Sequence, residues 1–265
     1  MHKNDVTIIL ATSIVPDHPN TEMIEETIHS IRAHFPDNEI IMQIDGLRKE
    51  QFHRKNDYDE YKNRILWKCL HEYKNVLPVI FDQHSHQTTM MRKTIKEIQT
   101  SLLLYVEGDT PLTPDIEIDW QKCLDMIEYE KANTIRFHFE ASIPKPHKHL
   151  MFGLEDDFMK TAQWSQRPHL TRASYYRNII LPPLDECAFI EDRTHGIIQD
   201  DILPYNVFSE EGWEKHKLWI YHPEGNIKRS YHLDGRQGTL KYTSIEDAKK
   251  ILKKSEMFKD DKDIL

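Results

Sequence analysis

Two acidic residues separated by a glycine follow a hydrophobic segment of the sequence. Residues 102–106 read LLLYV, and Glu107-Gly108-Asp109 comes directly after them. Carboxylates at i and i+2 beyond the end of a strand can turn toward one hard cation, which bridges a diphosphate and offsets the charge on a leaving group. The glycine would leave backbone room for a phosphate. Because Gly-Asp-Thr-Pro is also ordinary turn chemistry, the motif alone equally predicts a turn.

A second acidic pair ends another apolar stretch. Glu191 and Asp192 follow Phe189-Ile190, and a carboxylate in such a place can act as general base for an acceptor hydroxyl. Adjacent acids are also common on protein surfaces, and for the pair considered alone this is the simpler interpretation.

A basic segment lies near the carboxyl end of an otherwise acidic chain. Residues 226–236 read NIKRSYHLDGR, so Lys228, Arg229 and Arg236 surround His232. Ammonium and guanidinium groups bind phosphates, and a neutral imidazole can ligate a metal. The alternative is a solvated basic loop.

The first forty-five residues predict the element order that would position these side chains. Residues 6–12 (VTIILAT) are β-branched and apolar without helical periodicity, which is typical of a buried parallel strand. Asn20-Thr21 caps a helix that extends to about residue 35, and a second strand at 39–44 ends at Asp45. Strand, helix and strand with an acid after the second strand are typical of a nucleotide-binding α/β sheet.

The remaining elements follow from periodicity and turn signals. We expect a surface helix within 48–75, strands at 76–81, 102–106, 134–140 and 218–221, helices at 90–98, 119–131, 173–180, 204–213 and 244–258, a strand or turn at 187–190, and an irregular region at 144–172.

The length and composition are most simply explained by one α/β domain, and two small domains are the alternative. The 265 residues carry a formal net charge of −9 and are 38% hydrophobic. We expect a domain at 1–243, with a nucleotide-binding half (1–115) and an acceptor half (116–243), followed by a helix and tail at 244–265. Three scattered cysteines suggest neither a disulfide framework nor a cysteine zinc site, and no apolar run is long enough for a membrane span. A cytoplasmic protein without a membrane partner is expected.

The three motifs, in this order after a nucleotide-binding half-sheet, resemble the GT-A class of nucleotide-sugar glycosyltransferases, close to the large family-two type. In that class the first strand and the acid after the second hold the nucleoside. A DxD motif holds the metal and diphosphate, an xED motif carries the base, and a carboxy-terminal histidine completes the metal site. The resemblance spans roughly residues 6 to 236, and it rests on order and spacing because DxD alone is a weak pattern.

The resemblance implies a fold and a set of roles. The fold would be a GT-A-like, Rossmann-like α/β sheet, mixed but mainly parallel, flanked by helices and carrying an irregular acceptor-binding region. The roles are implied as follows: Thr12 and Asp45 for the nucleoside; Asp109, Glu107 and His232 for Mn²⁺ or Mg²⁺; Arg92, Lys228, Arg229 and Arg236 for the donor phosphates; Asp192 as the base, with Glu191 orienting the acceptor. Glu107 departs from the family pattern, so Asp109 is the more secure ligand.

Residues 164–177, WSQRPHLTRASYYR, lie where GT-A enzymes place their acceptor loops. Trp164 could stack on a sugar ring or a base, with Tyr175 and Tyr176 equally explained as packed aromatics, and Arg167 and Arg172 could meet a phosphate. His169 belongs to the same stretch. The histidines of this middle region lack zinc-ligand spacing; they are His138, His147, His149 and His169.

The implied function is metal-dependent transfer of a hexosyl or pentosyl group from a nucleotide-diphosphate donor to a hydroxyl acceptor. The stereochemistry is open, since the base assignment applies only to an inverting reaction. The acceptor is open as well. A hydroxymethylated base of bacteriophage DNA, modified in the host cytoplasm, suits the compact size and local basic stretches, whereas the net charge of −9 opposes it. The other candidates are a polysaccharide, protein or small-molecule acceptor, a non-catalytic nucleotide or nucleic-acid binding module, and a metal-dependent hydrolase.

Overall fold

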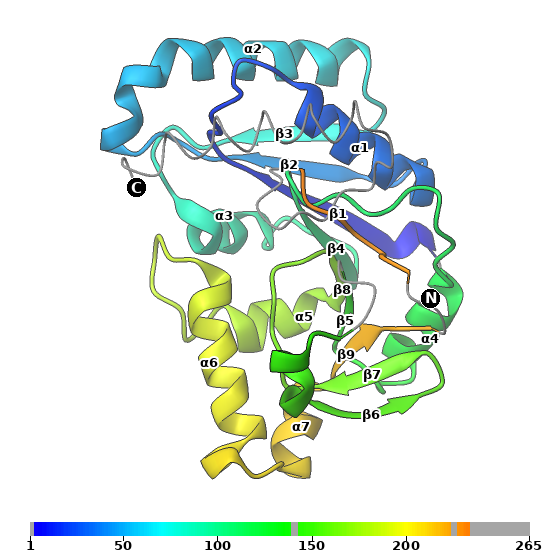
Figure 1. Cartoon of the computed structure of the whole chain (residues 1–265). Helices are drawn as coiled ribbons and strands as arrows, with labels where there is room; N and C mark the ends of the chain where they lie inside the picture. The colour runs from blue at the N-terminus through cyan, green and yellow to red at the C-terminus, as the bar shows by residue number, and fades with distance from the viewer. Residues whose placement is uncertain (1–2, 139–142, 224–226, 234–265) are drawn as a thin grey trace.

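The computed structural model describes residues 3–138, 143–223 and 227–233. Within these ranges nine strands form one sheet in the order β3-β2-β1-β4-β8-β5-β9-β7-β6 (Figure 1). The strands are β1 (Val6–Thr12), β2 (Ile40–Ile44), β3 (Val76–Ile80), β4 (Leu102–Glu107), β5 (Thr134–Phe137), β6 (Met151–Glu155), β7 (Phe158–Thr161), β8 (His169–Arg172) and β9 (Leu218–Tyr221).

Helices flank this sheet. Figure 1 shows α2 beyond β3 at one end of the molecule and α6 with α7 at the other. The α-helices are α1 (Glu22–His34), α2 (Lys55–His71), α3 (His86–Thr94), α4 (Trp120–Glu128), α5 (Ala173–Tyr175), α6 (Ile190–Ile202) and α7 (Glu210–His216). The 3₁₀-helices are η1 (Lys3–Asp5), η2 (Lys49–Arg54), η3 (Lys145–Leu150) and η5 (Pro204–Asn206), and η4 (Tyr176–Ile180) is a π-helix.

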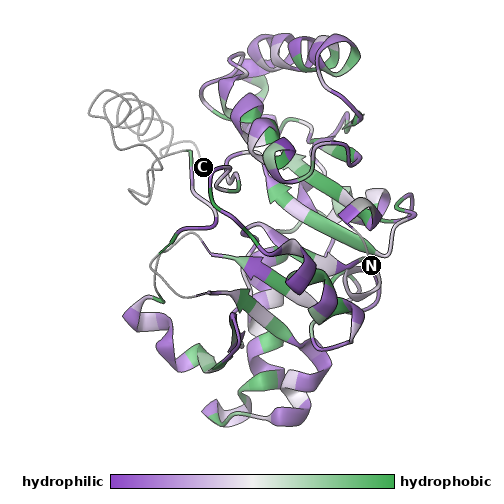
Figure 2. Ribbon diagram, turned by 90° about the vertical axis from the view of Figure 1, so that its right-hand side faces the viewer, coloured by the Kyte–Doolittle hydropathy of each residue, from purple (hydrophilic) through white to green (hydrophobic). Residues whose placement is uncertain are grey.

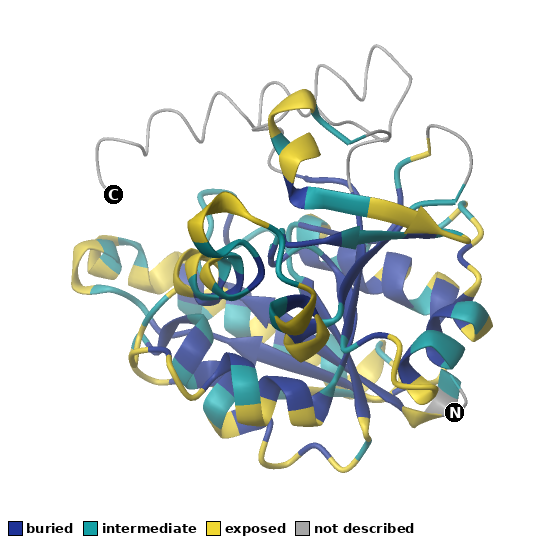
Figure 3. Cartoon of the chain, turned by 90° about the horizontal axis from the view of Figure 1, so that it is seen from below, coloured by how far each residue is buried: buried dark blue, intermediate teal, exposed yellow. Residues whose placement is uncertain are grey.

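The first four strands form a parallel half-sheet. β1 pairs in parallel with β2 and β4, and β2 pairs in parallel with β3. All residues of β1 and β2 are buried, because helices cover both faces of a parallel sheet. The hydrophobic strands and the mixed helices are visible in Figure 2, and Figure 3 shows exposed residues mainly on the outer helices and loops.

The second half of the sheet is mixed. β8 lies antiparallel between β4 and β5, β5 pairs in parallel with β9, and β7 joins β9 to β6 through antiparallel pairs. The expected α/β class with a mixed sheet flanked by helices is therefore confirmed. The sheet is not mainly parallel, because four of the eight strand pairs in the described residues are parallel and four are antiparallel.

The region expected to be irregular contains three strands. β6, β7 and β8 all lie within residues 144–172 and have only four or five residues each. Such short segments show little periodicity, and pairing with neighbouring strands decides their conformation. The turn between β6 and β7 places Asp156 at a φ of 50°.

Several helix boundaries also differ from the expectation. α3 begins at His86, four residues before the expected start. Of the strand or turn expected at 187–190, the structure has a turn that includes Cys187 and no strand. Instead α6 begins at Ile190, so Glu191 and Asp192 belong to the first turn of a helix. The expected helix at 204–213 is divided into η5 and α7, which Ser209 caps by accepting a bond from the Gly212 N–H at 3.1 Å.

The expected helix at 244–258 lies outside the described residues. No helix within the described ranges has both the length and the apolar character that crossing a bilayer requires.

Candidate functional site

The carboxyl ends of the parallel strands meet at one edge of the sheet, here called the carboxyl edge. Thr12 at the end of β1 pairs in register with Ile44, and its carbonyl accepts the Asp45 N–H at 3.0 Å. On the other side of β1, the Gly108 N–H donates to the Ala11 carbonyl at 2.9 Å. The two acid–glycine sequences thus lie on either side of β1.

The carboxylate of Asp45 holds the loop that leads into α3. Its Oδ1 accepts the N–H groups of Gly46 and Ser85 at 2.8 and 2.7 Å, and its Oδ2 accepts the His86 N–H at 3.0 Å. His84 Nδ1 lies 3.0 Å from the same Oδ2. The side chain is only 3% exposed. Asp45 therefore satisfies N–H groups that helix geometry leaves unpaired, and its contact with a nucleoside stays a prediction.

Gly46 explains why an acid–glycine pair occurs here. A Cβ at this position would lie 2.3 Å from the Gln83 carbonyl carbon, so only glycine lets the two backbones approach this closely. The Tyr58 hydroxyl adds a bond of 2.7 Å to the Asp45 carbonyl. These contacts make the loop after β2 a packed structural unit.

Glu107-Gly108-Asp109 also forms a turn. The Thr110 N–H donates to the Glu107 carbonyl at 3.0 Å, and the Gly108 carbonyl accepts the Thr27 hydroxyl of α1 at 2.7 Å. A Cβ on Gly108 would lie 3.3 Å from Thr12 Cγ2 and 3.4 Å from a methyl of Ile24. The glycine therefore permits close packing on β1 and α1, and the space beside it is filled by protein rather than left for a phosphate.

Asp109 and His232 come together at this turn. Asp109 Oδ2 lies 3.8 Å from His232 Nε2, with the side chains 22% and 10% exposed. The histidine is brought there by the end of the described chain, where the Leu233 N–H donates to the Asp109 carbonyl at 2.9 Å and the Tyr231 N–H to the Pro111 carbonyl at 3.1 Å. The Tyr231 hydroxyl also donates to Glu26 on α1 at 2.6 Å.

Glu107 lies on the other side of the turn. Its Oε1 accepts a hydrogen bond of 2.5 Å from the amide of Gln87, in the first turn of α3. Among the described residues, no three His, Cys, Asp or Glu side chains gather closely enough to hold a metal. The expected three-residue set of Glu107, Asp109 and His232 is therefore not assembled in the described part of the chain.

The pair of Asp109 and His232 still suits one kind of cation. Divalent magnesium sites commonly use one or two protein carboxylates and complete their coordination with substrate phosphates and water. Two side chains 3.8 Å apart fit a cation that binds together with a diphosphate. They do not fit a permanently held structural metal, which needs a closed set of protein ligands.

The acidic pair of α6 lies near this edge. Glu191 and Asp192 are exposed in the first turn of the helix. The charge of Asp192 acts on His86, and the charges of Glu107 and Glu191 both add to burial in raising the pKa of Tyr176. Tyr176 is thus a common neighbour of the turn after β4 and of α6.

Three residues that the sequence did not single out also lie at this edge. His86 has a φ of 56°, its ring lies 3.9 Å from the ring of Phe189, and its Nε2 is 3.4 Å from an Nη of Arg48. Burial lowers the pKa of His86 to about 4, and the positive charges of His84 and Arg48 act in the same direction. In the structure, the positive φ of His86 among charged side chains marks this position. The sequence gives no sign of it.

The predicted phosphate-binding residues have varied positions. Arg229 is buried; its guanidinium donates to the Ile227 carbonyl and lies 5.7 Å from the Tyr221 ring. Burial lowers the pKa of Arg229. Lys228 is half-buried, and Arg236 lies outside the described residues.

Arg92 holds a different part of the fold. Its guanidinium donates to the carbonyls of Leu181, at 2.8 Å, and Leu184. It therefore ties α3 to the chain that leads into α6. Its predicted contact with donor phosphates stays a prediction.

The predicted acceptor-binding residues are mainly packed inside. Trp164 is 3% exposed and donates to the Gln166 amide oxygen at 3.1 Å. His169 is 1% exposed; its ring nitrogens lie 2.7 Å from the Arg167 carbonyl and 2.8 Å from the Tyr176 hydroxyl. Burial lowers the pKa of His169 to about 4. Neither ring offers an open face to a sugar in this structure.

Arg172 lies at the opposite edge of the sheet. β8 is antiparallel to β4, and Arg172 pairs with Leu102, the first residue of β4, whereas Glu107 is the last. Its guanidinium donates to the Ile127 carbonyl. Because β8 runs antiparallel to β4, Arg172 lies far from the acidic motifs. Arg167 precedes the other end of β8 and is half-buried.

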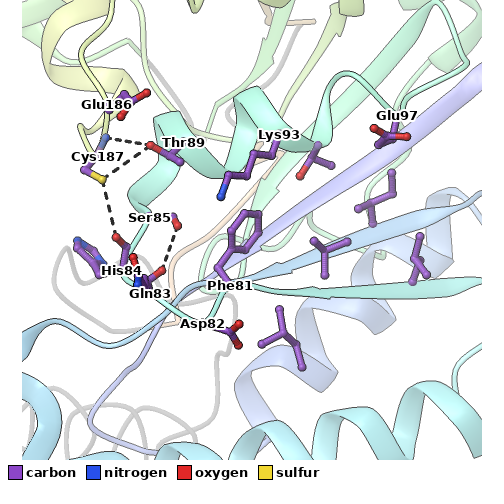
Figure 4. A pocket seen from close by; sticks show the side chains of 15 residues that line it. Phe81, Asp82, Gln83, His84, Ser85, Thr89, Lys93, Glu97, Glu186 and Cys187 are labelled. Carbon is purple, nitrogen blue, oxygen red and sulfur yellow. Dashed lines mark hydrogen bonds between the residues drawn. The ribbon is translucent and has the colours of Figure 1, made fainter.

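A pocket of about 670 Å³ opens beside the loop that Asp45 holds, between β3 and α3. Figure 4 shows Lys93 extending toward Phe81 in this pocket, and Cys187 joined to Thr89 and His84. The lining comprises Ile41, Leu77, Val79, Ile80, Phe81, Asp82, Gln83, His84, Ser85, Thr89, Lys93, Thr94, Glu97, Glu186 and Cys187. Its lining includes His84 and Ser85, which contact Asp45, but none of the acidic residues proposed from the sequence.

No protein-family model matches the sequence, and no curated protein matches it. Solved structures do match. TarS residues 1–349 from S. aureus in complex with UDP-GlcNAc has a TM-score of 0.50 at 12% identity, with 96% of this chain and 70% of that chain covered. A second structure of the same TarS fragment has a TM-score of 0.45 at 10% identity, and the match covers 87% of this chain but only 60% of that one.

Two further structures fall slightly below this level of similarity. GalNAc-T7 with UDP, GalNAc and Mn²⁺ has a TM-score of 0.49 at 12% identity, covering 95% of this chain and 48% of that chain. The 4-diphosphocytidyl-2C-methyl-D-erythritol synthase of Anaerococcus prevotii has a TM-score of 0.49 at 14% identity, covering 96% and 97%. The similarity to TarS over nearly the whole chain defines the class of fold: a GT-A-like, Rossmann-type α/β sheet.

Proposed function

We propose that this protein is a metal-dependent glycosyltransferase that moves a sugar from a nucleotide-diphosphate donor to a hydroxyl acceptor. The observation that carries the proposal is the pairing of Asp109 and His232 at the carboxyl edge of a GT-A-like sheet. In open α/β sheets this edge is where ligands bind. The similar TarS fragment was solved with UDP-GlcNAc, which supports a nucleotide-sugar donor.

The donor diphosphate would lie at the turn after β4. Asp109 and His232 would hold Mn²⁺ or Mg²⁺, which supplies positive charge to the leaving diphosphate. Thr12 and Asp45 would lie beside the nucleoside at the same edge. Asp45 also holds the loop that leads into α3. Lys228 and Arg236 are the basic side chains that we assign to the phosphates.

The base would come from the first turn of α6. Asp192 is exposed there and accepts the proton of the acceptor hydroxyl, while Glu191 orients the acceptor. This assignment applies to an inverting reaction.

The charges around α6 favour a neutral acceptor. Four exposed carboxylates lie in its first turn and the preceding loop: Asp185, Glu186, Glu191 and Asp192. Arg193 pairs with Asp185 at 2.6 Å, and the guanidinium groups of Arg172 and Arg177 donate to backbone carbonyls. A polyanion such as DNA would meet like charge here, so we assign a carbohydrate or other neutral hydroxyl and treat hydroxymethylated DNA as the competing acceptor.

The test is turnover of a panel of nucleotide sugars with Mn²⁺ or Mg²⁺, with and without candidate acceptors. We expect wild-type protein to release a nucleoside diphosphate only with metal, and Asp109→Asn to lose about 100-fold or more of this rate. Asp57→Asn, an exposed site on α2, is the matched control. Absence of turnover and of metal-dependent nucleotide binding in the wild type would contradict the proposal.

The acceptor is tested separately. Mass spectrometry of hydroxymethylated DNA and of neutral oligosaccharides after incubation with the active donor distinguishes the two classes. Modified nucleosides with unmodified oligosaccharides would overturn the assignment of a neutral acceptor.

A further inference from the structure

The first turn of α3 is attached residue by residue to the segment that leads into α6. These segments are about 100 positions apart in the sequence. Each of four successive residues makes a contact: the ring of His86 lies 3.9 Å from that of Phe189, the Gln87 amide oxygen accepts the Ile190 N–H at 3.1 Å, the Thr88 hydroxyl donates to the Ala188 carbonyl at 2.6 Å, and the Thr89 hydroxyl accepts the Cys187 N–H at 3.1 Å.

Gln87 also reaches the turn after β4. Its Nε2 donates to Glu107 Oε1 at 2.5 Å while its Oε1 accepts the Ile190 N–H at 3.1 Å. Ile190 is the first residue of α6, so its N–H has no acceptor within the helix. A single half-buried amide therefore joins the two acidic motifs of the carboxyl edge.

We propose that Gln87 is a positioning residue that sets the distance between the acceptor base and the metal–diphosphate site. This inference rests on the proposed function. Glu191 and Asp192 follow Ile190 directly, and Asp109 follows Glu107 by two residues. Fixing Ile190 to Glu107 therefore fixes one acidic motif relative to the other, and transfer between bound substrates requires such fixed geometry.

The amide of Gln87 meets both requirements at this position. Its nitrogen donates to the carboxylate of Glu107, and its oxygen accepts the N–H of Ile190. An ionised carboxylate at position 87 would accept from Ile190 but repel Glu107. A protonated one would restore the donor, because two carboxyl groups at hydrogen-bond distance share a proton more readily than isolated ones. A thioether would supply neither bond.

The experiment compares Gln87→Glu and Gln87→Met with wild type at about pH 8 and about pH 5.5. We expect both variants to lose about 10–100-fold in kcat at the higher pH, with nucleoside diphosphate affinity within about twofold of wild type. Relative to wild type, Gln87→Glu recovers at the lower pH and Gln87→Met does not. Gln121→Glu is the matched control, because Gln121 donates to Asp125 at 2.7 Å on the exposed side of α4, away from the site.

Hydrogen exchange of residues 187–193 gives a readout that needs no turnover. We expect faster exchange than wild type in Gln87→Met at both pH values, and in Gln87→Glu only at the higher one. Unchanged exchange, or a Gln87→Glu variant that stays as impaired at the lower pH as at the higher, would overturn the inference. Failure of the proposed function can be distinguished from failure of this inference. If the proposed function is wrong, the wild-type protein turns over no donor, regardless of the hydrogen-exchange result.

Discussion

Two acid–glycine turns on either side of β1 have the same residue types and different roles. The side chain of Asp45, after β2, is 3% exposed and receives three backbone N–H groups and a histidine nitrogen. The side chain of Asp109, after β4, is 22% exposed and faces His232 at 3.8 Å. The carboxylate of Asp45 stabilises the fold, whereas that of Asp109 is exposed enough for a ligand to reach it.

The backbone around each turn explains the difference. The loop after β2 must supply acceptors for the N–H groups that begin α3, and Asp45 is the acceptor nearest to them. The turn after β4 satisfies its own backbone, through the Thr110 N–H to the Glu107 carbonyl and the Gly108 N–H to the Ala11 carbonyl. A strand-end acid is therefore a better ligand candidate when the following backbone has other acceptors.

The sharpest test of this contrast is removal of each carboxylate. Asp45→Ala leaves several buried N–H groups without an acceptor, so we expect the free energy of unfolding to fall by about 3–5 kcal/mol. Asp109→Ala should change it by about 1 kcal/mol or less. Urea denaturation followed by circular dichroism measures both. Equal losses would show that the two carboxylates do not differ in structural role.

The two glycines extend the comparison to packing. A methyl at position 46 would lie 2.3 Å from the Gln83 backbone, whereas one at position 108 would lie 3.3 Å from a methyl of Thr12. We expect Gly46→Ala to cost about 3 kcal/mol and Gly108→Ala about 1–2 kcal/mol. The measurement is again urea denaturation. A larger loss at 108 than at 46 would contradict the assignment of the first turn as the more tightly packed one.

The smallest expected effect is a pH dependence beside Asp45. The pKa of His86 is about 4 in the folded protein, against an ordinary value of 6.5, chiefly because of burial. The folded state thus favours the neutral ring, so its stability contribution is complete above pH 6.5 and is lost as the pH falls toward 4.

Substitution of His86 by asparagine, which tolerates its positive φ, removes this titration. We expect the melting-temperature advantage of wild type over His86→Asn to shrink by about 2–4 °C between pH 7 and pH 4.5. His29→Asn, at an exposed position on α1, is the control. An advantage that stays constant across this range would show that burial of neutral His86 does not contribute.

Much of the fold was predictable, because several of its strands are buried runs of mainly apolar residues. β1, β2, β4 and β9 appear within one residue of their expected bounds, and the predicted meeting of Asp109 and His232 occurs at 3.8 Å. Long buried strands are read directly from apolar runs.

The remaining features depend on tertiary contacts. Nothing in the sequence near Glu107 indicates that Gln87 donates a hydrogen bond to it. Nothing near Asp45 indicates that its carboxylate accepts the N–H groups of Ser85 and His86. Trp164 and His169 were expected at a binding surface and are buried, since the short strand β8 inserts into the sheet. The short strands β6, β7 and β8 mix apolar with polar or glycine residues and show no clear pattern, and long-range side-chain bonds have no local sequence signal.

The most direct test of the central claim is calorimetric titration of nucleoside diphosphates into wild type, Asp109→Asn and Asp57→Asn, with and without Mn²⁺. If Asp109 and His232 hold the metal that binds the diphosphate, Mn²⁺ should raise the affinity of the preferred nucleotide by about tenfold or more in wild type and Asp57→Asn. Asp109→Asn should show no such increase. Equal affinity with and without metal in all three proteins would contradict the account.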